Sequence, residues 1–351
     1  MFNSDFVVFG VALLASASLT VPVRRLALRY GMVDHPGPRK VHAKPIPLLG
    51  GLAIYLGFVI AVLFALHGAV QQIAGILAGA TLVATVGFLD DRGLLHHQIK
   101  LFIGMPLAAL FLLASGVRAQ VFSQFVPGAV GPVLDALLTV LWVVGITASF
   151  SILDHMDGLC AGVAAVAAAF FTISAVLSGQ TLVRTLGAAA FGAALGFLRW
   201  NFNPAKIFMG DSGAMFLGFL MATLGLKIRP VVADFPVGWL VPVLILGVPV
   251  LDTTLVSISR GRRGLLPFTS PGKDHTAHRL SNLGLGHRGA VLVLYCLGAF
   301  FGVIAVLLPR VASRTAYVLT AAVAVCGLIA IALLETAPYE RQAKPKPSLA
   351  E

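Results

Sequence analysis

The chain has 351 residues, of which 58% are hydrophobic and only 11% are charged. Its mean hydropathy of +0.94 excludes an ordinary soluble globular protein and predicts a polytopic membrane protein. The formal net charge of +11 does not indicate nucleic-acid binding, because the basic residues are spread over short loops between apolar segments. In such loops they orient a membrane protein and meet anionic lipid headgroups.

The apolar segments predict an all-α fold that crosses the membrane many times. A membrane helix needs about 20 apolar residues to cross a hydrocarbon layer of roughly 30 Å. No Lys or Arg precedes the first segment, and Arg24 and Arg25 follow it directly, which predicts an uncleaved span with its N-terminus outside. We expect about eleven transmembrane helices, with ten as the alternative, at residues 5–23, 50–66, 71–89, 101–117, 133–150, 161–177, 183–198, 213–226, 237–254, 290–308 and 315–334. The chain after 334 predicts a disordered cytoplasmic tail over 335–351.

The basic residues support this topology. With the N-terminus outside, nineteen of the 25 Lys and Arg residues fall in inside loops or the tail, and six fall in outside loops. This distribution obeys the positive-inside rule. The same topology places the polar loops 31–51 and 255–289 on the cytoplasmic side.

Five of the 14 acidic residues form three short motifs at the edges of apolar segments: Asp90-Asp91, Asp154-x-x-Asp157 and Asp211. Carboxylates near hydrocarbon are costly to desolvate, so such residues tend to be functional. Adjacent carboxylates such as Asp90 and Asp91 need a cation if both are ionised in a dry site. The spacing of three predicts that Asp154 and Asp157 lie on one face of a helix. If the motifs converge, they could hold a divalent cation and handle phosphate chemistry. The alternative is a set of hydrated turns.

The loop before residue 213 combines an amide, a cation and an aromatic ring. The side chains of Asn201 and Lys206 could bind nucleotide and phosphate groups, and Phe208 could stack on a base. The Pro-rich loop at 31–51 carries Lys44, which could approach a phosphate. An interfacial loop that faces anionic lipid is the alternative for both segments.

Two histidines stand three residues apart in the long basic loop at 260–288. His275 and His278 have the spacing of a ligand pair, but a transition-metal site needs further His or Cys nearby, and none is evident. We therefore expect them, with Arg279, to hydrogen-bond a diphosphate or a sugar. A solvated basic loop is the alternative.

Together these motifs resemble the polyprenyl-phosphate N-acetylhexosamine-1-phosphate transferases of glycosyltransferase family 4. The resemblance covers residues 30–290 in order. It rests on Val33-Asp-His-Pro-Gly-Pro-Arg-Lys-Val-His42 with Pro47 and Gly50-Gly51, on Asp90-Asp91, on Asp154-x-x-Asp157-Gly-Leu, on Pro204-Ala-Lys-Ile-Phe-Met-Gly-Asp211-Ser-Gly, and on His275-x-x-His278-Arg-Leu.

The resemblance implies a single integral-membrane catalytic domain over 1–334, in the plasma (inner) membrane, with its active site on the cytoplasmic face. It implies transfer of a sugar 1-phosphate from a UDP-N-acetylhexosamine to undecaprenyl or another polyprenyl phosphate, with release of UMP, to initiate cell-envelope glycan synthesis. Mg²⁺ is the implied cofactor, with Mn²⁺ as a substitute. No nucleic-acid partner is implied. Relatives form dimers, so a homodimer is an open alternative.

The resemblance also implies roles for single residues. Asp211 corresponds to the metal ligand and Asp90 to the base that keeps the lipid phosphate ionised. The resemblance further implies uridine contacts for Asp157, Asn201 and Phe208. From the residues themselves we expect supporting acids at Asp91 and Asp154, phosphate contacts from Lys44, Lys206, His275 and His278, and a substrate contact from Arg279.

The chain departs from the family pattern in the third motif. The family reads Asn-x-x-Asn-x-x-Asp-Gly-x-Asp-Gly, whereas this chain has Ala148 and Ser151 for the asparagines and His155 for the first glycine. Ser151 and Asp154 are the further candidate metal ligands. A triple histidine is common in the last loop of the family, and its middle position is Ala277 here.

UDP-GlcNAc is the expected donor, because His-x-x-His-Arg-Leu resembles the GlcNAc-type loop more than that of the phospho-MurNAc-pentapeptide transferases, which are the alternative. A transporter or lipid flippase is an alternative of another class, and it predicts acids near the bilayer midplane and inverted repeats. The departures at Ala148, Ser151 and Ala277 leave a third alternative, a non-catalytic family member.

Overall fold

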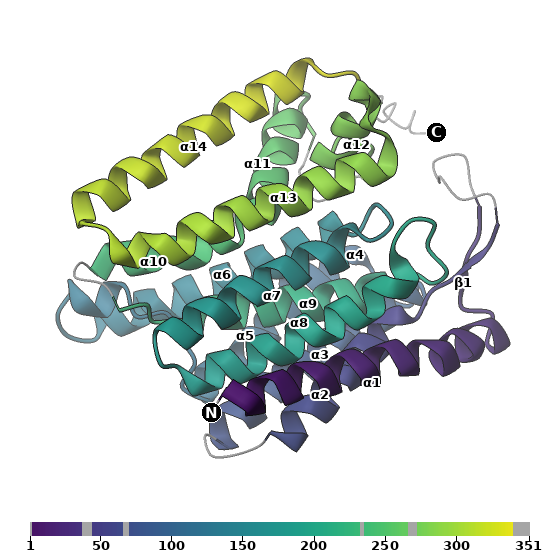
Figure 1. Ribbon diagram of the computed structural model, residues 1–351, viewed down its shortest axis with the longest axis horizontal. Coiled ribbons are helices and arrows are strands. Elements are labelled where there is room, and N and C mark those ends of the chain that lie inside the picture. The colour runs from purple at the N-terminus through teal and green to yellow at the C-terminus, as the bar shows by residue number, and fades with distance from the viewer. Residues whose placement is uncertain (1, 37–43, 66–69, 232–234, 266–271, 340–351) are drawn as a thin grey trace, which may run out of the picture.

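The computed structural model describes residues 2–36, 44–65, 70–231, 235–265 and 272–339. Helices make up almost all of the described elements, and most run side by side along the longest axis of the molecule (Figure 1). The elements are α1 (Phe2–Arg29), β1 (Val33–Asp34), β2 (Ile46–Pro47), α2 (Gly50–Phe64), α3 (Val70–Asp91), α4 (His97–Ile99), η1 (Lys100–Gly104), α5 (Met105–Ala114), η2 (Phe122–Gln124), α6 (Val130–Leu153), α7 (Leu159–Leu177), α8 (Thr181–Asn201), α9 (Gly210–Lys227), α10 (Phe235–Ile245), α11 (Gly247–Arg262), α12 (Thr276–Leu280), η3 (Ser281–Leu285), α13 (Gly286–Leu307), η4 (Leu308–Arg310) and α14 (Ser313–Thr336).

The helices confirm the prediction of an all-α polytopic membrane protein. Among the described residues, seven helical segments are long and apolar enough to cross a membrane, and α10 with α11, bent by 78° at their junction, would make an eighth span. Each of the eleven predicted segments contains a helix, but α2 and the segment Lys100–Ala114 are shorter than the others. The exact number of spans and their orientation stay predictions.

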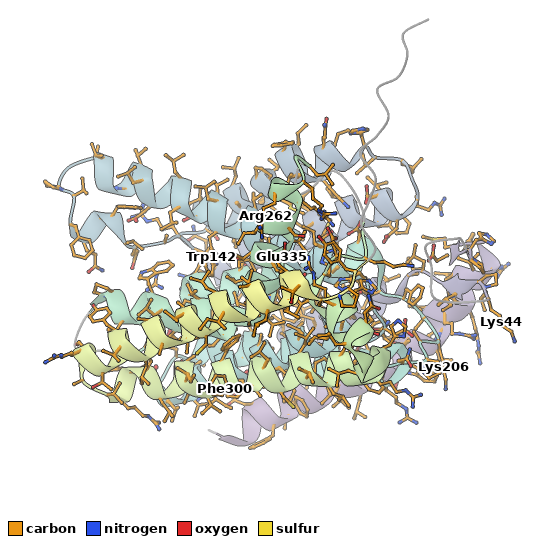
Figure 2. The ribbon with its side chains drawn as sticks, turned by 90° about the horizontal axis from the view of Figure 1, so that it is seen from above. Lys44, Trp142, Lys206, Arg262, Phe300 and Glu335 are labelled. Atoms are coloured by element: carbon orange, nitrogen blue, oxygen red, sulfur yellow. The ribbon has the colours of Figure 1, made fainter. Side chains whose placement is uncertain are left out.

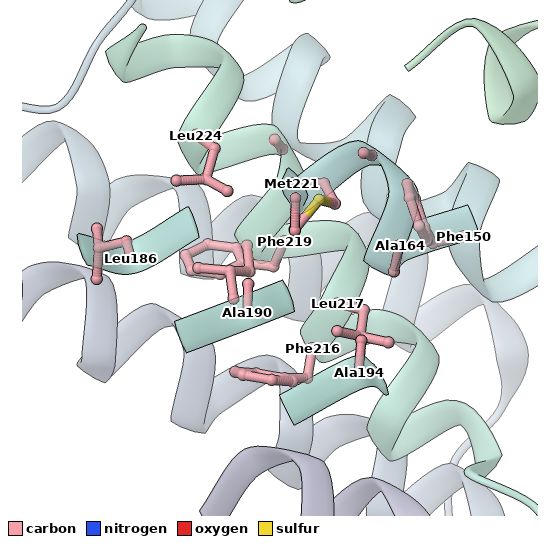
Figure 3. Packing of buried hydrophobic residues seen from close by; sticks show 14 of the residues in the cluster. Phe150, Ala164, Leu186, Ala190, Ala194, Phe216, Leu217, Phe219, Met221 and Leu224 are labelled. Carbon is pink, nitrogen blue, oxygen red and sulfur yellow. The ribbon is translucent and has the colours of Figure 1, made fainter. Parts of the chain in front are cut away.

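The centre of the bundle is α9, which is buried almost all round and packs against α3 and α6. Phe216 and Phe219 of α9 lie against small residues of α8 such as Ala190 and Ala194 (Figure 3). Small residues at helix contacts let backbones approach closely, which is how membrane helices gain packing energy without a hydrophobic driving force. By contrast, only 11% of the most apolar stretch of α14 is buried, as expected for a helix that faces lipid.

Polar contacts close the end of the bundle where the N-terminus lies (Figure 1). Asp135 of α6 is fully buried and accepts hydrogen bonds from the backbone N–H groups of Val121, Phe122 and Ser123 and from the Ser123 hydroxyl. Asp5 pairs with Arg184 at 2.8 Å. The loops that carry most of the sequence motifs lie at the opposite end of the molecule, with β1, α4 and α12.

The first five residues of the predicted disordered tail are part of the described structure. α14 continues to Thr336, Ala337 is buried, and Tyr339 contacts two arginines near α12. The rest of the predicted tail, residues 340–351, lies outside the described residues.

Candidate active site

The end of α3 meets the start of α9 through the carboxylate of Asp91. One oxygen of Asp91 accepts a hydrogen bond from the Asp211 backbone N–H at 2.8 Å, and the other accepts from the Ser212 N–H at 3.1 Å. Asp91 therefore caps the N-terminus of α9, where free N–H groups and the helix dipole favour an anion. Asp91 was predicted to support catalysis, and in the structure its carboxylate has this capping role.

Two glycines allow this close contact. Gly210 has a left-handed φ of +71°, and a Cβ there would lie 2.5 Å from the Asp91 carboxylate. A Cβ on Gly87 of α3 would lie 2.5 Å from the Asp211 carbonyl oxygen. Glycine is needed at both positions because any side chain would push α3 and α9 apart.

Four side chains meet where α3, η1, α6 and α9 end or begin. Lys100 Nζ lies 2.8 Å from Asp90 Oδ2 and 2.6 Å from Asp211 Oδ2. The Ser151 hydroxyl donates to the other oxygen of Asp211. The two carboxylates thus share the Lys100 ammonium. The three side chains are only partly buried, so a ligand could reach them. We call Asp90, Lys100, Ser151 and Asp211 the carboxylate cluster.

Lys100 is a site residue that sequence reasoning missed. It is one of the nineteen basic residues predicted to lie inside, with no role predicted for it. Its position at the start of an apolar segment, soon after the aspartate pair, was the available signal, because a cation there must find a partner.

The segment after α6 connects the carboxylate cluster to the other loops. The prediction that Asp154 and Asp157 share a helix face is wrong, because α6 ends at Leu153 and both aspartates lie in the following turn. Asp157 accepts hydrogen bonds from the Asn203 side chain at 3.0 Å and from the Ala205 N–H at 2.9 Å. Asp157 therefore fixes the loop at 202–206 in the conformation seen here.

Asp154 follows α6 directly and lies near the carboxylate cluster. Burial, and then the charges of Asp211 and Asp91, raise the pKa of Asp154 well above its usual range. A carboxyl group in this environment is protonated more readily, so it can donate a hydrogen bond as well as accept one.

The loop between α8 and α9 is held by its own backbone and by Asn201. The Asn201 side chain is buried, accepts from the Gly158 N–H and donates to the Ile207 carbonyl, both at 3.0 Å. Asn201 was predicted to bind substrate, but the oxygen and the nitrogen of its side-chain amide both bond the backbone, so Asn201 braces the loop. Phe208 stays partly exposed, and its N–H bonds the Pro47 carbonyl at 2.9 Å.

Lys44 and Lys206, both predicted to contact phosphate, are exposed at the end of the molecule that carries β1 (Figure 2). Lys206 lies over the Trp200 ring at 5.5 Å. The contact of these two lysines with phosphate stays a prediction.

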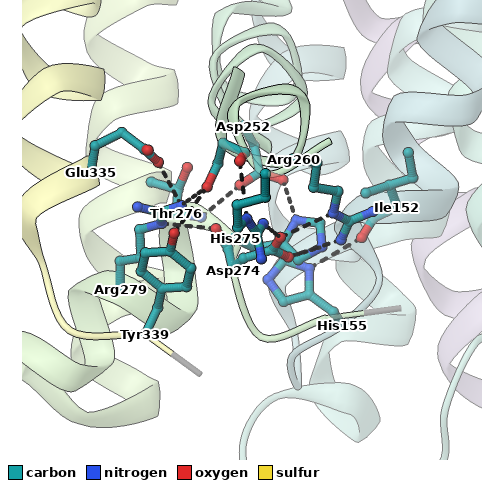
Figure 4. A network of polar contacts seen from close by, with 12 residues as sticks. Ile152, His155, Asp252, Arg260, Asp274, His275, Thr276, Arg279, Glu335 and Tyr339 are labelled. Carbon is teal, nitrogen blue, oxygen red and sulfur yellow. Dashed lines mark hydrogen bonds and ion pairs between the residues drawn. The ribbon is translucent and has the colours of Figure 1, made fainter. Parts of the chain in front are cut away.

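The two predicted histidines lie in a buried polar network around α12 (Figure 4). His275 Nδ1 lies 2.8 Å from Asp252 Oδ2, and the other oxygen of Asp252 accepts from the Thr276 N–H at 2.7 Å. Asp252 belongs to α11 and was missed by sequence reasoning, because a single Asp in an apolar segment carries no motif. The carboxylate fixes the ring orientation of His275.

Asp274 precedes His275 and is held by two arginines. Arg260 makes two hydrogen bonds to the Asp274 carboxylate, at 3.0 and 2.8 Å, and Arg263 makes one at 2.6 Å. Burial alone would raise the pKa of Asp274, but the two arginines outweigh it and hold the pKa below its usual range. Asp274 thus stays ionised and anchors the histidine loop to the end of α11.

Arg279 is fully buried, which does not fit its predicted contact with substrate. Its guanidinium donates to the carbonyls of Asp274 and Leu334 and to the Ser259 hydroxyl, each at 2.8 Å. Glu335 Oε1 lies 2.8 Å from the guanidinium, and the Tyr339 ring covers it at 4.0 Å. Arg279 therefore ties α12 to the end of α14.

A third histidine joins this network from the turn after α6. The ring of His155 lies 4.2 Å from that of His275 in a stacked arrangement and 4.8 Å from that of His278. Burial, and then the neighbouring His275, lower the pKa of His155 well below its usual range, so the ring is neutral. We call His155, His275 and His278 the histidine cluster.

Comparison with known proteins identifies the family. The glycosyl transferase family 4 model matches residues 73–229. A protein of Bacillus subtilis (strain 168), named a probable undecaprenyl-phosphate N-acetylglucosaminyl 1-phosphate transferase, is 37% identical over 86% of this chain and 84% of its own length. The chain belongs to glycosyl transferase family 4.

Two more distant family 4 relatives have related names. The decaprenyl-phosphate N-acetylglucosaminephosphotransferase of Mycolicibacterium smegmatis is 35% identical over 78% of this chain and 74% of its own length. The undecaprenyl-phosphate alpha-N-acetylglucosaminyl 1-phosphate transferase of Escherichia coli (strain K12) is 27% identical over 81% of this chain and 78% of its own length.

The carboxylate cluster of this family 4 protein suits a hard cation. Its possible ligands are all oxygens, from Asp90, Asp211 and Ser151, which is the donor set that Mg²⁺ prefers. Within the part of the chain that the structure describes, no three His, Cys, Asp or Glu side chains form an all-protein metal cage. Mg²⁺ does not need one, because it usually binds through one or two carboxylates, waters and substrate phosphates.

Proposed function

We propose that this protein transfers N-acetylglucosamine 1-phosphate from UDP-GlcNAc to a polyprenyl phosphate and releases UMP. The observation that carries the proposal is the carboxylate cluster, in which Asp90 and Asp211 share Lys100 at hydrogen-bond distance. Two carboxylates that already bind one cation are suited to a site where divalent metal and phosphates meet. The names of the three relatives described above point to the same reaction.

The chemistry follows from the groups present. An oxygen of the lipid phosphate attacks the β-phosphorus of the donor, and the bond from that phosphorus to the bridging oxygen breaks, so that UMP leaves with this oxygen. Such transfer is catalysed mainly by positioning and by neutralising charge. Mg²⁺ held by Asp211 and Ser151 would act as a Lewis acid on the diphosphate oxygens.

Individual residues have separate tasks in this proposal. Asp90 keeps the lipid phosphate ionised, and Lys100 neutralises phosphate charge. His275 and His278 hydrogen-bond phosphate oxygens, and Phe208 stacks on uracil. Asp91, Asn201 and Arg279 hold the elements that carry these groups.

Release of UMP by purified protein in detergent, with Mg²⁺ and undecaprenyl phosphate, tests the proposal directly. Asp211→Asn and Asp90→Asn should abolish transfer without changing expression, whereas Asp5→Asn, at the opposite end of the molecule, should not abolish it. Activity that survives chelation with EDTA would argue against the metal, and normal turnover by Asp211→Asn would refute the assigned site. A wild-type protein that releases no UMP would favour the transporter or the non-catalytic alternative.

The donor can be settled in one membrane preparation with radiolabelled UDP-GlcNAc, UDP-GalNAc and UDP-MurNAc-pentapeptide. We expect incorporation from UDP-GlcNAc. Exclusive use of the pentapeptide donor would contradict the proposal and support the phospho-MurNAc-pentapeptide alternative.

We also propose that the site faces the cytoplasm in the plasma (inner) membrane. The distribution of Lys and Arg supports this orientation. In a protein whose three cysteines are replaced by alanine, Leu94→Cys, between α3 and α4, and Phe125→Cys, after η2, place single thiols on well-exposed positions in loops predicted on opposite sides of the membrane. An impermeant maleimide should label only Phe125→Cys in intact cells and both after permeabilisation. Labelling of Leu94→Cys alone in intact cells would reverse the topology.

A further inference from the structure

The ring of His155 is fixed in orientation by its own backbone turn. His155 Nδ1 lies 3.1 Å from the carbonyl oxygen of Ile152 (Figure 4). A carbonyl oxygen can only accept, so Nδ1 carries the proton and the ring plane is set by the end of α6. His155 Nε2 is buried and has no hydrogen-bond partner among the described residues. No second hydrogen bond from the described residues therefore holds the ring in place. Its contacts with the other imidazoles are the remaining interactions that position it.

His275 is anchored in the same way from another element. Its Nδ1 faces the Asp252 carboxylate of α11, and its Nε2 lies 4.0 Å from Asp274, beyond hydrogen-bond distance. Stacking on His155 thus leaves the Nε2 edge of His275 available for a ligand. The two stacked rings are each tied to a different helix, α6 for His155 and α11 for His275.

This stack joins the two halves of the candidate site. Asp154, which lies in the field of Asp211, is the neighbour of His155 in the chain. Ser151, on the last turn of α6, binds Asp211 directly. One short segment, 151–155, therefore touches the carboxylate cluster on one side and His275 and His278 on the other. The short helix α12 has only five residues, so its position depends on contacts with neighbouring elements, of which this stack is one.

We propose that His155 is a positioning residue of the transfer reaction, whose ring sets the position of His275 and His278 relative to the carboxylate cluster. This inference rests on the proposed function, because the reaction that it serves is the one proposed above. A diphosphate bound at the site would meet the carboxylate cluster at Asp211 and the histidine cluster at His275. Without the ring of His155, α12 can shift against α6, and a displacement of about 1 Å can cost on the order of 100-fold in rate.

Three substitutions test the stacking of the His155 ring and its hydrogen bond separately. His155→Phe keeps an aromatic ring for stacking and removes the bond to Ile152. His155→Asn keeps a donor close to the Nδ1 position and removes the ring. His155→Gly removes both. His96→Asn, a histidine that caps α4 at the same end of the molecule, is the matched control.

The rate of transfer should depend on whether residue 155 carries an aromatic ring. We expect His155→Asn and His155→Gly to lower kcat by about 10- to 100-fold, with a much smaller change in the KM for UDP-GlcNAc. His155→Phe and His96→Asn should stay near the wild-type rate. Melting temperatures in detergent, measured on the same samples, identify a variant that is only unfolded. Equal kcat in wild type and His155→Gly, or a loss in His155→Phe as large as in His155→Gly, would overturn the inference.

A spectroscopic readout separates this inference from the proposed reaction. In protein labelled with ¹⁵N-histidine, the ring signals of His275 should move in His155→Asn and His155→Gly but not in His155→Phe or His96→Asn. Unmoved His275 signals in His155→Gly would contradict the positioning role even if no transfer could be measured. A wild type that releases no UMP but shows the shifts would refute only the proposed function.

Discussion

The ammonium nitrogen of Lys100 lies 2.6 Å from Oδ2 of Asp211, although 111 residues separate the two along the chain. The same nitrogen reaches Asp90, so one cation links the end of α3 to the start of α9. Partly buried charges of like sign repel each other strongly unless a cation lies between them. Lys100 therefore makes it feasible for Asp90 and Asp211 to lie side by side.

Replacing Lys100 tests this relationship. Lys100→Met should lower the rate of transfer by about 100-fold or more, because it removes a preorganised cation from a site where phosphate charge is stabilised. Lys100→Arg should restore part of the rate, since the charge returns with a different shape. UMP release gives the measurement, and Arg92→Met, an exposed cation beside the aspartate pair, is the control. A Lys100→Met protein as active as Arg92→Met would show that the cation is dispensable.

Gly210 and Gly93 form a matched pair for the contact between α3 and α9. Both have a left-handed φ, +71° and +69°, but a Cβ would strike the Asp91 carboxylate only at Gly210 and meets open space at Gly93. Each Ala variant bears the cost of the backbone conformation, about 1–2 kcal/mol. Only Gly210→Ala should also displace the Asp91 cap and abolish UMP release. Similar residual activity in the two variants would mean that the cap does not need this close approach.

The end of α14 offers a test of how the histidine loop is held. The Tyr339 ring covers Arg279 at 4.0 Å and Arg263 at 5.5 Å, so Tyr339→Leu removes two cation–π contacts, each worth about 0.5–2 kcal/mol. We expect Tyr339→Leu to lower both the melting temperature and the transfer rate, and Tyr339→Phe to keep them. A chain that stops after Tyr339 should behave like the wild type, whereas one that stops after Leu334 should lose activity. Full activity after removal of 335–351 would contradict this role.

Asp135 tests stability away from the candidate site. Its buried carboxylate satisfies three backbone N–H groups of the loop before α6. Asp135→Ala leaves these donors unsatisfied and should lower the free energy of unfolding by about 2–3 kcal/mol. Thermal unfolding in detergent measures this loss. Below the melting temperature, the KM for UDP-GlcNAc should be unchanged; a raised KM would mean that this end of the bundle communicates with the site.

Local patterns in the sequence predicted the class of fold well. Each of the eleven predicted apolar segments contains a helix, because a run of apolar residues identifies a membrane helix without any knowledge of its neighbours. The same local reading failed at Asp154 and Asp157. A spacing of three indicates one helix face only while the helix continues, and α6 ends at Leu153.

The sequence by itself determined that this is a polytopic membrane protein of glycosyl transferase family 4 with five clustered aspartates, because hydropathy and motifs are properties of short segments. Only the tertiary structure decided that Asp91 caps α9 whereas Asp90 shares Lys100 with Asp211. It also decided that Asp252 orients His275 and that His155 stacks on it. These assignments depend on which helix ends meet, and side-chain packing between segments far apart in the chain fixes that meeting.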